Sequence, residues 1–510
     1  MASHTIGPFP AELLAAKKQI RERARSYGLD FFPVVFEMCD YEQMNQIAAY
    51  GGFPQRYPHW RFGAEYERLR KQHFYGLGRV YEMVINNDPC YAYLQESNQL
   101  VDQKLVISHV YGHADFFKNN LWFSQTNRKM MDEMANHATR IRRHIEKQGY
   151  DTVEKFLDVC LSVEDLIDAH GMFLNRGPME QKPEEVPRQE QVSKFKAKDY
   201  LDRWINPPEL LEAEAKKMRE DRAKLRHVTP ARPTRDVLQY LLQHARLDDW
   251  QMDCLAIVRE EAYYFAPQGM TKVMNEGWAS YWHSTLMTKH FVDATEIIDY
   301  ADHHSGTVHM PPGNFNPYKV GLELFRDIED RWNKGRFGKA YEESDNVGEK
   351  KSWDKGLGLG REKIFEVRRM YNDVNFIDEF MTPEFIEKHK FYQYGRDPHT
   401  GQLRIVTRDP ARIKQAMLYY LTNHGRPFIY VVDGDYCGRG ELYLAHKHNG
   451  QDLEIKFAIE TLKNIHKIWQ HPVHLQARID DDMILFTYAG DQPKQQTIHD
   501  ELPKPAHQMA

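Results

Sequence analysis

The segment from Met270 to His283, MTKVMNEGWASYWH, is apolar on nearly every side when it is placed on a helical wheel. With Glu276 at the origin of a 3.6-residue repeat, His283 falls on the same side as the carboxylate. Trp278 and Tyr281 spread over the flanks. A helix that is apolar almost all round is usually buried, so the pattern predicts a buried helix with an acid and an imidazole on one face.

A carboxylate inside such a helix is unfavourable unless a positive group pairs with it. For Glu276, a metal ion is one such partner, and an arginine, a lysine or simple protonation are the alternatives. Candidate metal ligands occur far upstream in LVISHVYGHADFFKNN, where the pattern predicts a helix over about residues 102–120. His109 and His113 are four residues apart, so both rings point the same way and can close on one ion.

Two histidines at this spacing and a carboxylate from a second helix form the ligand set of a gluzincin-type zinc site. Residues 275–281, NEGWASY, closely resemble the NEGFASY segment of gluzincin aminopeptidases, in which the glutamate is the third zinc ligand. The resemblance implies that His109, His113 and Glu276 bind Zn²⁺ or another divalent metal. The first-helix motif departs from the H-E-x-x-H of that family, because Val110 stands where the general base is expected.

A replacement base is expected on the helix predicted for Trp250 to Phe265, WQMDCLAIVREEAYYF. Glu261 lies in the middle of its apolar stripe, and Glu260 lies off the edge. An acid at the centre of an apolar face suits a general acid and base, or a fourth metal ligand. His283, two turns after Glu276, would stabilise an oxyanion or complete the ligand shell. The predicted catalytic residues are therefore Glu261 and His283.

A second shell around the ligands is predicted from Asp115, Glu260 and Tyr281. Asp115 follows His113 by two positions and lies off the face that carries the two histidines. It is expected either to accept a hydrogen bond from a ligand histidine on another helix or to be a surface acid.

His303, His304 and Ser305 fall in a stretch with glycines and three prolines, HHSGTVHMPPGNFNP. Loops of this composition often line functional sites. We therefore expect a loop whose residues contact substrate, with a structured turn as the alternative.

The composition narrows the classes of protein to consider. Of 510 residues, 41% are hydrophobic and 12% are aromatic, which is typical of a globular protein with two or three domains. A formal charge of −6 gives no sign of polyanion binding, so no nucleic-acid partner is expected. No apolar run reaches about 18 residues, which argues against a membrane span. The five cysteines lack C-x-x-C spacing and no signal peptide is evident, so we expect a cytoplasmic protein.

The expected fold class is α+β, with a mainly α-helical, gluzincin-like core and a small C-terminal ferredoxin-like α/β domain. The β-α-β-β-α-β order of the C-terminal pattern carries the ferredoxin-like expectation. The expected segments are an N-terminal helical region with the H-x-x-x-H helix, a charged exposed insertion, a helical core with the NEGWASYWH helix, the α+β domain and a disordered tail. Their boundaries are 1–175, 176–235, 236–394, 395–495 and 496–510.

Five segments in this order resemble the SpoVR family, stage V sporulation protein R, over nearly the whole chain. They are HVYGHADFFKNN, EEAYYFAPQGMTKVMNEGWASYWH, HHSG, NPYKVGLELF and GREKIFEVRRMYNDVNFIDEFMT. The resemblance implies a role in sporulation or stationary-phase stress. It also implies, as partners, a PrkA-type serine kinase with an AAA+ domain and a von Willebrand-type protein. The name of the family points to the spore cortex, and so to a substrate related to peptidoglycan.

Four hypotheses follow for the buried polar residues. The first is a zinc-dependent hydrolase of peptide or amide bonds in which Glu261 moves the proton. The second is a regulatory protein that kept the metal scaffold and lost catalysis, for which Val110 is the argument. The third is a carboxylate-bridged di-metal oxidase that uses Glu260, Glu261 and Glu276 with the histidine pair, although the repeated Glu-x-x-His pairs typical of such sites are missing around these residues. The fourth is a buried hydrogen-bonded network without metal.

Overall fold

The computed structural model describes most of the chain and divides it into two compact units. The first unit comprises Met1–Glu154 and Tyr263–Arg426, and the second comprises Lys155–Ala262 and Pro427–Ala510. The described residues are 9–74, 81–173, 207, 216, 229–397 and 399–498. Helices dominate the first unit, the second combines helices with a five-stranded sheet, and the fold class is α+β, as expected. Among the described helices, none combines the length and hydrophobicity that crossing a bilayer requires.

Over the residues described between 9 and 148, the N-terminal half of the first unit combines a small sheet with five α-helices. In this sheet β1 (Val34–Cys39) pairs in parallel with β3 (Cys90–Gln95), which pairs antiparallel with β2 (Glu82–Ile85). The helices are α1 (Ala11–Ser26), α2 (Tyr41–Ala49), α3 (Trp60–Phe74), α4 (Leu100–Asn119) and α5 (Met130–Gln148), with a 3₁₀ turn η1 (Leu121–Phe123).

The remainder of the first unit consists of helices with a two-stranded hairpin before the last of them. The larger helices are α11 (Lys272–Leu286), α12 (Ile297–Val308), α13 (Pro317–Lys334), α16 (Gly360–Met370) and α19 (Pro410–Leu421). The shorter elements are η3 (Met287–Phe291), α14 (Lys339–Glu342), α15 (Val347–Ser352), α17 (Asp373–Phe380), α18 (Pro383–His389) and η4 (Thr422–Gly425). The hairpin pairs β4 (Gln393–Arg396) with β5 (Leu403–Thr407).

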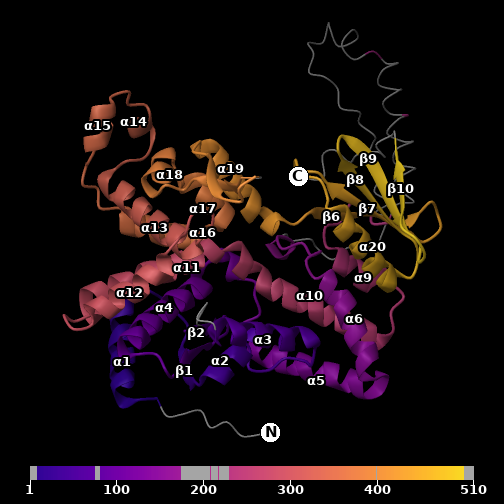
Figure 1. Ribbon diagram of the computed structural model, residues 1–510, viewed down its shortest axis with the longest axis horizontal. Coiled ribbons are helices and arrows are strands. Elements are labelled where there is room, and N and C mark those ends of the chain that lie inside the picture. The colour runs from indigo at the N-terminus through magenta and orange to yellow at the C-terminus, as the bar shows by residue number, and fades with distance from the viewer. Residues whose placement is uncertain are drawn as a thin grey trace. The chain divides into compact units, whose positions relative to one another are not determined.

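The two helices predicted to carry the metal ligands are confirmed. Helix α4 covers the expected span, and its residues from Leu105 to Phe117 are buried without a break. Helix α11 is equally buried, because it lies between α4 and α13 (Figure 1). A Cβ added at Gly277 would lie 2.4 Å from the carbonyl carbon of Gly321, and one added at Gly112 would lie 2.7 Å from the Cα of Ala279. The small residues of the NEGWAS segment therefore permit close helix packing on both sides.

The N-terminus of α11 is capped by a residue from a distant helix. The carboxylate of Asp373, on α17, accepts hydrogen bonds from the backbone N–H groups of Val273 at 2.8 Å and Met274 at 2.9 Å. Thr271 precedes the helix and makes no side-chain cap. Asp373 thus satisfies two of the donors that a helix N-terminus leaves free, and fixes the start of the helix that carries Glu276.

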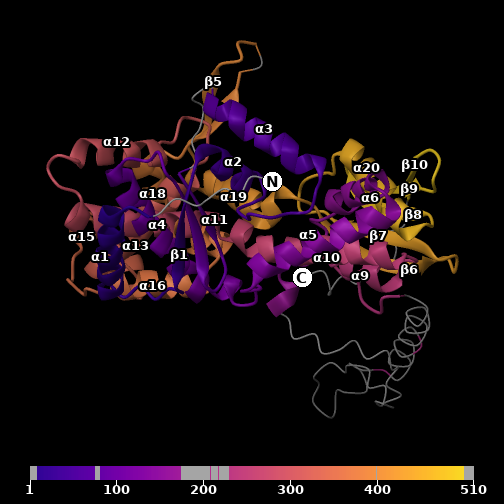
Figure 2. The same ribbon diagram turned by 90° about the horizontal axis from the view of Figure 1, so that it is seen from below.

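The second unit contains a five-stranded sheet with strand order β10-β9-β8-β7-β6. Strands β7 and β8 are parallel and are joined by α20, which packs on one face of the sheet (Figure 2), and the other neighbours are antiparallel. The strands are β6 (Phe428–Tyr436), β7 (Glu441–Lys447), β8 (Val473–Ile479), β9 (Asp482–Tyr488) and β10 (Lys494–Thr497). The helices include α9 (Val237–His244) and α20 (Ile455–Trp469) with the short η2 (Gly171–Phe173), while α6 (Tyr150–Ser162) and α10 (Asp249–Met270) run across the division in the chain.

A C-terminal α+β domain is present, but the ferredoxin-like order expected for it is wrong. The first strand and helix of that pattern are β5 and α19, and both belong to the first unit. Strand β5 pairs with β4 rather than with the five-stranded sheet. The alternation of apolar and polar residues predicts a strand but not the strand with which it pairs. The sequence analysis therefore assigned β5 to the wrong sheet. Most of the expected insertion at 176–235 and of the expected tail at 496–510 lies outside the described residues.

Candidate metal centre

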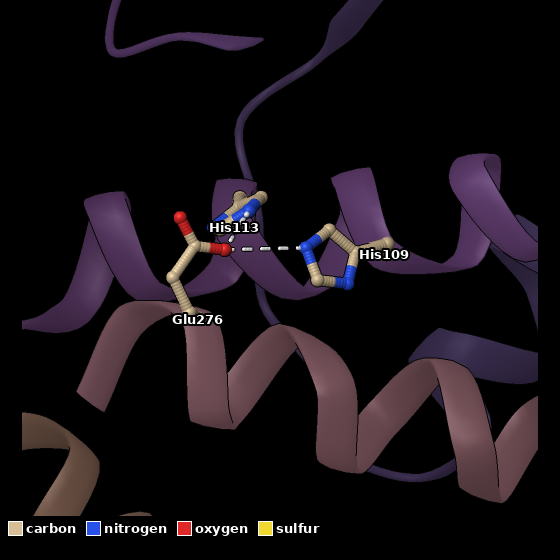
Figure 3. Close-up of side chains that lie close together, drawn as sticks. All are labelled: His109, His113 and Glu276. Carbon is tan, nitrogen blue, oxygen red and sulfur yellow. Dashed lines mark ion pairs between the residues drawn. The ribbon is translucent and has the colours of Figure 1, made fainter. Parts of the chain in front are cut away.

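Helices α4 and α11 bring together the three residues predicted as metal ligands. The Oε2 atom of Glu276 lies 3.5 Å from Nε2 of His109 and 3.4 Å from Nε2 of His113 (Figure 3). All three side chains are buried, and their ligand atoms lie within 4.8 Å of one another. Two segments more than 160 positions apart in sequence therefore form one cluster with the composition of a metal site.

The outer nitrogen of His113 is held by the helix that carries the carboxylate. Its Nδ1 lies 2.8 Å from Oδ1 of Asn275. Because an amide oxygen only accepts hydrogen bonds, Nδ1 of His113 donates, and in the neutral ring Nε2 keeps its lone pair facing Glu276. Orientation of a ligand histidine through its second nitrogen is typical of metal sites.

The outer nitrogen of His109 begins a chain of imidazoles. Its Nδ1 lies 2.9 Å from Nδ1 of His283, and Nε2 of His283 lies 3.0 Å from Nδ1 of His304. If each neutral ring donates towards His304, Nε2 of His109 is left with its lone pair towards Glu276. Burial, with a further contribution from His109, holds the pKa of His283 well below its usual range, which is consistent with a neutral ring.

The distances and the unsatisfied atoms test whether a divalent metal fits these residues. Nε2 of His109 and Oε2 of Glu276 are both buried and have no hydrogen-bond partner among the described residues. Their separation is too long for a charge-assisted hydrogen bond, which spans about 2.7–2.9 Å. Tetrahedral ligands at about 2.0–2.2 Å from an ion stand about 3.3–3.5 Å apart, which agrees with both distances. The donor set therefore fits Zn²⁺ or a similar divalent cation.

The second oxygen of Glu276 has a different partner. Nζ of Lys272 lies 2.6 Å from Oε1 of Glu276, one helical turn away on α11. Burial acts to raise the pKa of Glu276, but Lys272 and His113 outweigh it and hold that pKa well below its usual range. Glu276 is therefore an ionised carboxylate, as a metal ligand must be.

The two ligand histidines have opposite electrostatic surroundings. Burial, followed by the charge of His113, lowers the pKa of His109 to about 4, so His109 is neutral near pH 7. Burial also acts to lower the pKa of His113, but the adjacent Glu276 outweighs it and raises that pKa. A cation bound between them would take the place of the proton that Glu276 favours on His113.

Two residues near the cluster were missed by the sequence analysis. Glu82 begins β2, and burial raises its pKa to about 7, while the charge of His113 acts to lower that pKa and the charge of Glu276 acts to raise it. Tyr318 on α13 has its ring centre 6.0 Å from that of His109, and the charge of Glu276 raises its pKa well above its usual range. Neither lies in a recognisable motif, and a lone acid at the start of a short apolar strand was the only local signal for Glu82.

The histidines expected in a substrate loop lie on a helix instead. His303, His304 and Ser305 belong to α12, and Ser305 is exposed. Nδ1 of His303 lies 2.7 Å from Oδ1 of Asp102, on α4. The loop prediction was wrong because the prolines that suggested a loop begin after Val308, where the helix ends.

Asp115 is neither a surface acid nor a partner of a ligand histidine, so both expectations for it were wrong. It is fully buried, and Oδ2 accepts a hydrogen bond from the indole N–H of Trp278 at 2.8 Å. Oδ1 accepts from the backbone N–H of Asp30 at 2.8 Å, and Arg368 approaches to 3.5 Å. Burial raises its pKa to about 6. A wheel places Asp115 off the histidine face, but it does not show that other elements cover that side.

The remaining predicted residues lie elsewhere. The hydroxyl of Tyr281 donates to Oε2 of Glu329 at 2.5 Å rather than to a ligand of the cluster. Glu260 is exposed and Glu261 is buried on α10, and both belong to the second unit. The catalytic role of Glu261 and the second-shell role of Glu260 stay predictions. His283 contacts His109 rather than Glu276, which favours an orienting role over direct ligation.

Comparison with known proteins places both units in one family. The model for SpoVR like protein matches residues 9–426, and the model for the SpoVR-like C-terminal domain matches residues 427–480. The chain is 31% identical over 500 residues to the Uncharacterized protein YcgB of Escherichia coli (strain K12), covering 91% of this chain and 92% of that protein. No solved structure matches. The junction between the two family models coincides with the division at Arg426 and Pro427.

Proposed function

The chain belongs to the SpoVR family, and we propose that it is a metal-dependent hydrolase that cleaves a peptide or amide bond. The observation that carries the proposal is the buried pair of Nε2 of His109 and Oε2 of Glu276. These atoms face each other at 3.5 Å without a hydrogen-bond partner among the described residues. Leaving two such atoms unsatisfied is unfavourable unless a ligand joins them.

His109, His113 and Glu276 would hold Zn²⁺ or another divalent metal. Bound there, the ion supplies a Lewis acid and lowers the pKa of water towards about 7. The protein must then provide a group that accepts and returns a proton near neutral pH. Glu82 suits this role, because burial raises its pKa to about 7 and its charge interacts with two of the three ligands. Glu261, predicted from the sequence, is the competing candidate.

Tyr318 is proposed to donate a hydrogen bond to the oxygen that gains negative charge during hydrolysis. Its ring lies beside His109, and Glu276 keeps its hydroxyl protonated by raising the pKa. His283 and Asn275 would hold the two ligand rings in place through their outer nitrogens.

The biological setting is proposed from the family alone. A role in sporulation or stationary-phase stress would involve a substrate related to cell-wall peptidoglycan, whose stem peptides contain amide bonds. A PrkA-type AAA+ serine kinase and a von Willebrand-type protein are the proposed partners, and the proposed location is the cytoplasm.

A second candidate function is a regulatory protein that binds metal without catalysis. Val110 favours it, because this residue is fully buried on α4 at the position where gluzincins carry the catalytic glutamate. A metal-bound protein that leaves every tested peptide and amide intact, yet binds the kinase or the von Willebrand-type partner, would support this alternative.

The first test is elemental analysis of the full chain beside His109→Ala and Glu276→Gln. We expect about one divalent ion per native chain and its loss in both variants. Glu323→Gln is the matched control, because Glu323 is a half-buried acid on α13 that is paired with a lysine at 3.3 Å and lies outside the cluster. Native protein without metal, purified without chelator, would overturn the metal centre.

The second test compares Glu82→Gln with Glu261→Gln in hydrolysis of peptides and of peptidoglycan stem peptides. The variant that lacks the base should keep its metal and lose about 10²- to 10⁴-fold in turnover. Full activity in both variants would remove both acids from the proposed role.

A further inference from the structure

The two carboxylate oxygens of Glu276 have different partners. The stability of the helix does not explain why Lys272 pairs with one of them. Lys272 holds Oε1 at 2.6 Å, whereas Oε2 faces His109 and His113 at 3.5 and 3.4 Å. Lys272 is the first residue of α11, where a positive charge is unfavourable against the helix dipole. A lysine four residues before a glutamate is also the weaker order for a helical ion pair. The position of Lys272 therefore requires another reason.

A carboxylate can bind a metal ion through one oxygen or through both. With the ammonium group of Lys272 on Oε1, Oε2 alone is available to an ion between the two histidines. We propose that Lys272 is a positioning residue that restricts Glu276 to ligation through one oxygen and that balances its charge in the metal-free protein. This inference rests on the proposed metal centre, and it explains how a bound ion would be kept at a low coordination number.

The side chain of Lys272 is 57% exposed although its partner carboxylate is buried. The ammonium group thus reaches inward from the solvent side of the cluster, along α11 rather than across to α4. Restricting the carboxylate to one oxygen leaves more of the coordination sphere to water and substrate, which a hydrolytic metal site requires.

The proposal predicts two effects of opposite sign when Lys272 is removed. Without metal, Glu276 keeps a buried charge with a weaker set of partners, so the metal-free protein should unfold at a lower temperature. With metal, the repulsion between the ammonium group and the ion is gone and Oε1 becomes free to ligate, so the ion should bind about tenfold more tightly. A purely structural ion pair would produce the first effect and not the second.

The test uses the full chain titrated with Co²⁺, whose visible absorption reports coordination number. Native protein should give the intense spectrum of four-coordinate Co²⁺, and Lys272→Met should give the weaker spectrum of a higher coordination number, with tighter binding. Lys272→Arg should restore the native spectrum, because a guanidinium group can also hold Oε1. Lys319→Met is the matched control, because Lys319 forms the same i, i+4 pair with Glu323 on α13.

Each result decides a different question. An unchanged spectrum and affinity in Lys272→Met would overturn the positioning role and leave the metal centre standing. A lower unfolding temperature alone would identify a plain ion pair and overturn the proposal equally. If Lys272→Met does not fold, we expect Lys272→Gln to show the same change in spectrum and affinity, and an unchanged spectrum and affinity in that variant would overturn the positioning role. No Co²⁺ binding by native protein would overturn the metal centre, and the inference with it.

Discussion

Two acids lie buried where α4 packs against α11, and they differ in whether both of their carboxylate oxygens have hydrogen-bonding or ionic partners. Asp115, on α4, accepts hydrogen bonds from Trp278 and from the backbone of Asp30, and Arg368 balances its charge. Glu276, on α11, has one oxygen paired with Lys272, while its other oxygen has no hydrogen-bond partner among the described residues. Both acids are more than nine-tenths buried and lie in the first unit.

The partners of each carboxylate oxygen distinguish a structural acid from a candidate metal ligand. Burial alone does not distinguish Asp115 from Glu276. The difference is that every oxygen of Asp115 is used by donors, as expected for a network that holds the fold together. The free oxygen of Glu276 faces the lone pair of a histidine nitrogen, an arrangement that only a cation or a proton makes favourable.

The largest expected effect is a loss of stability at Asp115. Asp115→Ala would leave the indole N–H of Trp278 unsatisfied and Arg368 buried without its partner. Breaking a buried pair of this kind costs about 3–5 kcal/mol. Denaturant unfolding of the metal-free protein measures it. A loss within about 0.5 kcal/mol, the range of ordinary surface substitutions, would contradict a structural role for Asp115.

A large loss of metal affinity is expected at His113. His113→Ala removes one of three ligands, so Zn²⁺ affinity should fall by at least about 100-fold, or about 2.7 kcal/mol. Isothermal titration measures the affinity. The folded fraction of Asp115→Asn serves as the control and should bind Zn²⁺ like the native protein. Equal losses of Zn²⁺ affinity in both variants would mean that Asp115 and the ligand cluster form one coupled site.

A smaller loss of metal affinity is expected when the hydrogen bond that orients a ligand histidine is removed. Asn275→Ala leaves Nδ1 of His113 without its acceptor at 2.8 Å, and loss of such a contact lowers metal affinity by about 10- to 100-fold. Asn119 is the matched amide at the other acid, where it donates to the backbone oxygen of Asp115. Asn119→Ala should lower stability by about 1 kcal/mol and leave metal affinity unchanged.

The smallest effects are slopes of stability against pH, and they have opposite signs at His109, in the cluster, and at Asp115. The pKa of His109 falls from 6.5 to about 4, so the unfolded chain binds more protons and stability rises with pH between those values. The pKa of Asp115 rises from 3.8 to about 6, so the folded chain binds more protons and stability falls with pH over that window. Each slope is at most about 1.4 kcal/mol per pH unit.

Substitution separates the two slopes, because each variant lacks one of the two titrating groups. Relative to the native protein, His109→Gln should shift the slope of stability over pH 4 to 6 in the negative direction, and Asp115→Asn should shift it in the positive direction. Unfolding free energies measured across this range check both signs. Identical pH profiles for the two variants would contradict the lowered pKa of His109 and the raised pKa of Asp115.

The sequence by itself determined the elements that carry the cluster and their family. Helical periodicity is local, so the pattern predicted α4 and α11 with nearly correct limits and placed His109 and His113 on one face. The NEGWASY segment identified Glu276 as their partner across more than 160 positions. Burial of Glu276 followed from the apolar surroundings along its own helix, which is also a local property.

Only the tertiary structure decided which polar atoms are satisfied. Three partners of the Asp115 carboxylate, Asp30, Trp278 and Arg368, are distant in sequence, so no local pattern reveals them. The environment of Glu82 likewise arises where β2 meets other elements. The sequence left a metal or a lysine as alternative partners of the carboxylate, and the fold gives Lys272 one oxygen and directs the other to the histidines. Periodicity fixes the direction of a side chain on its own helix, whereas its partners depend on how distant helices pack.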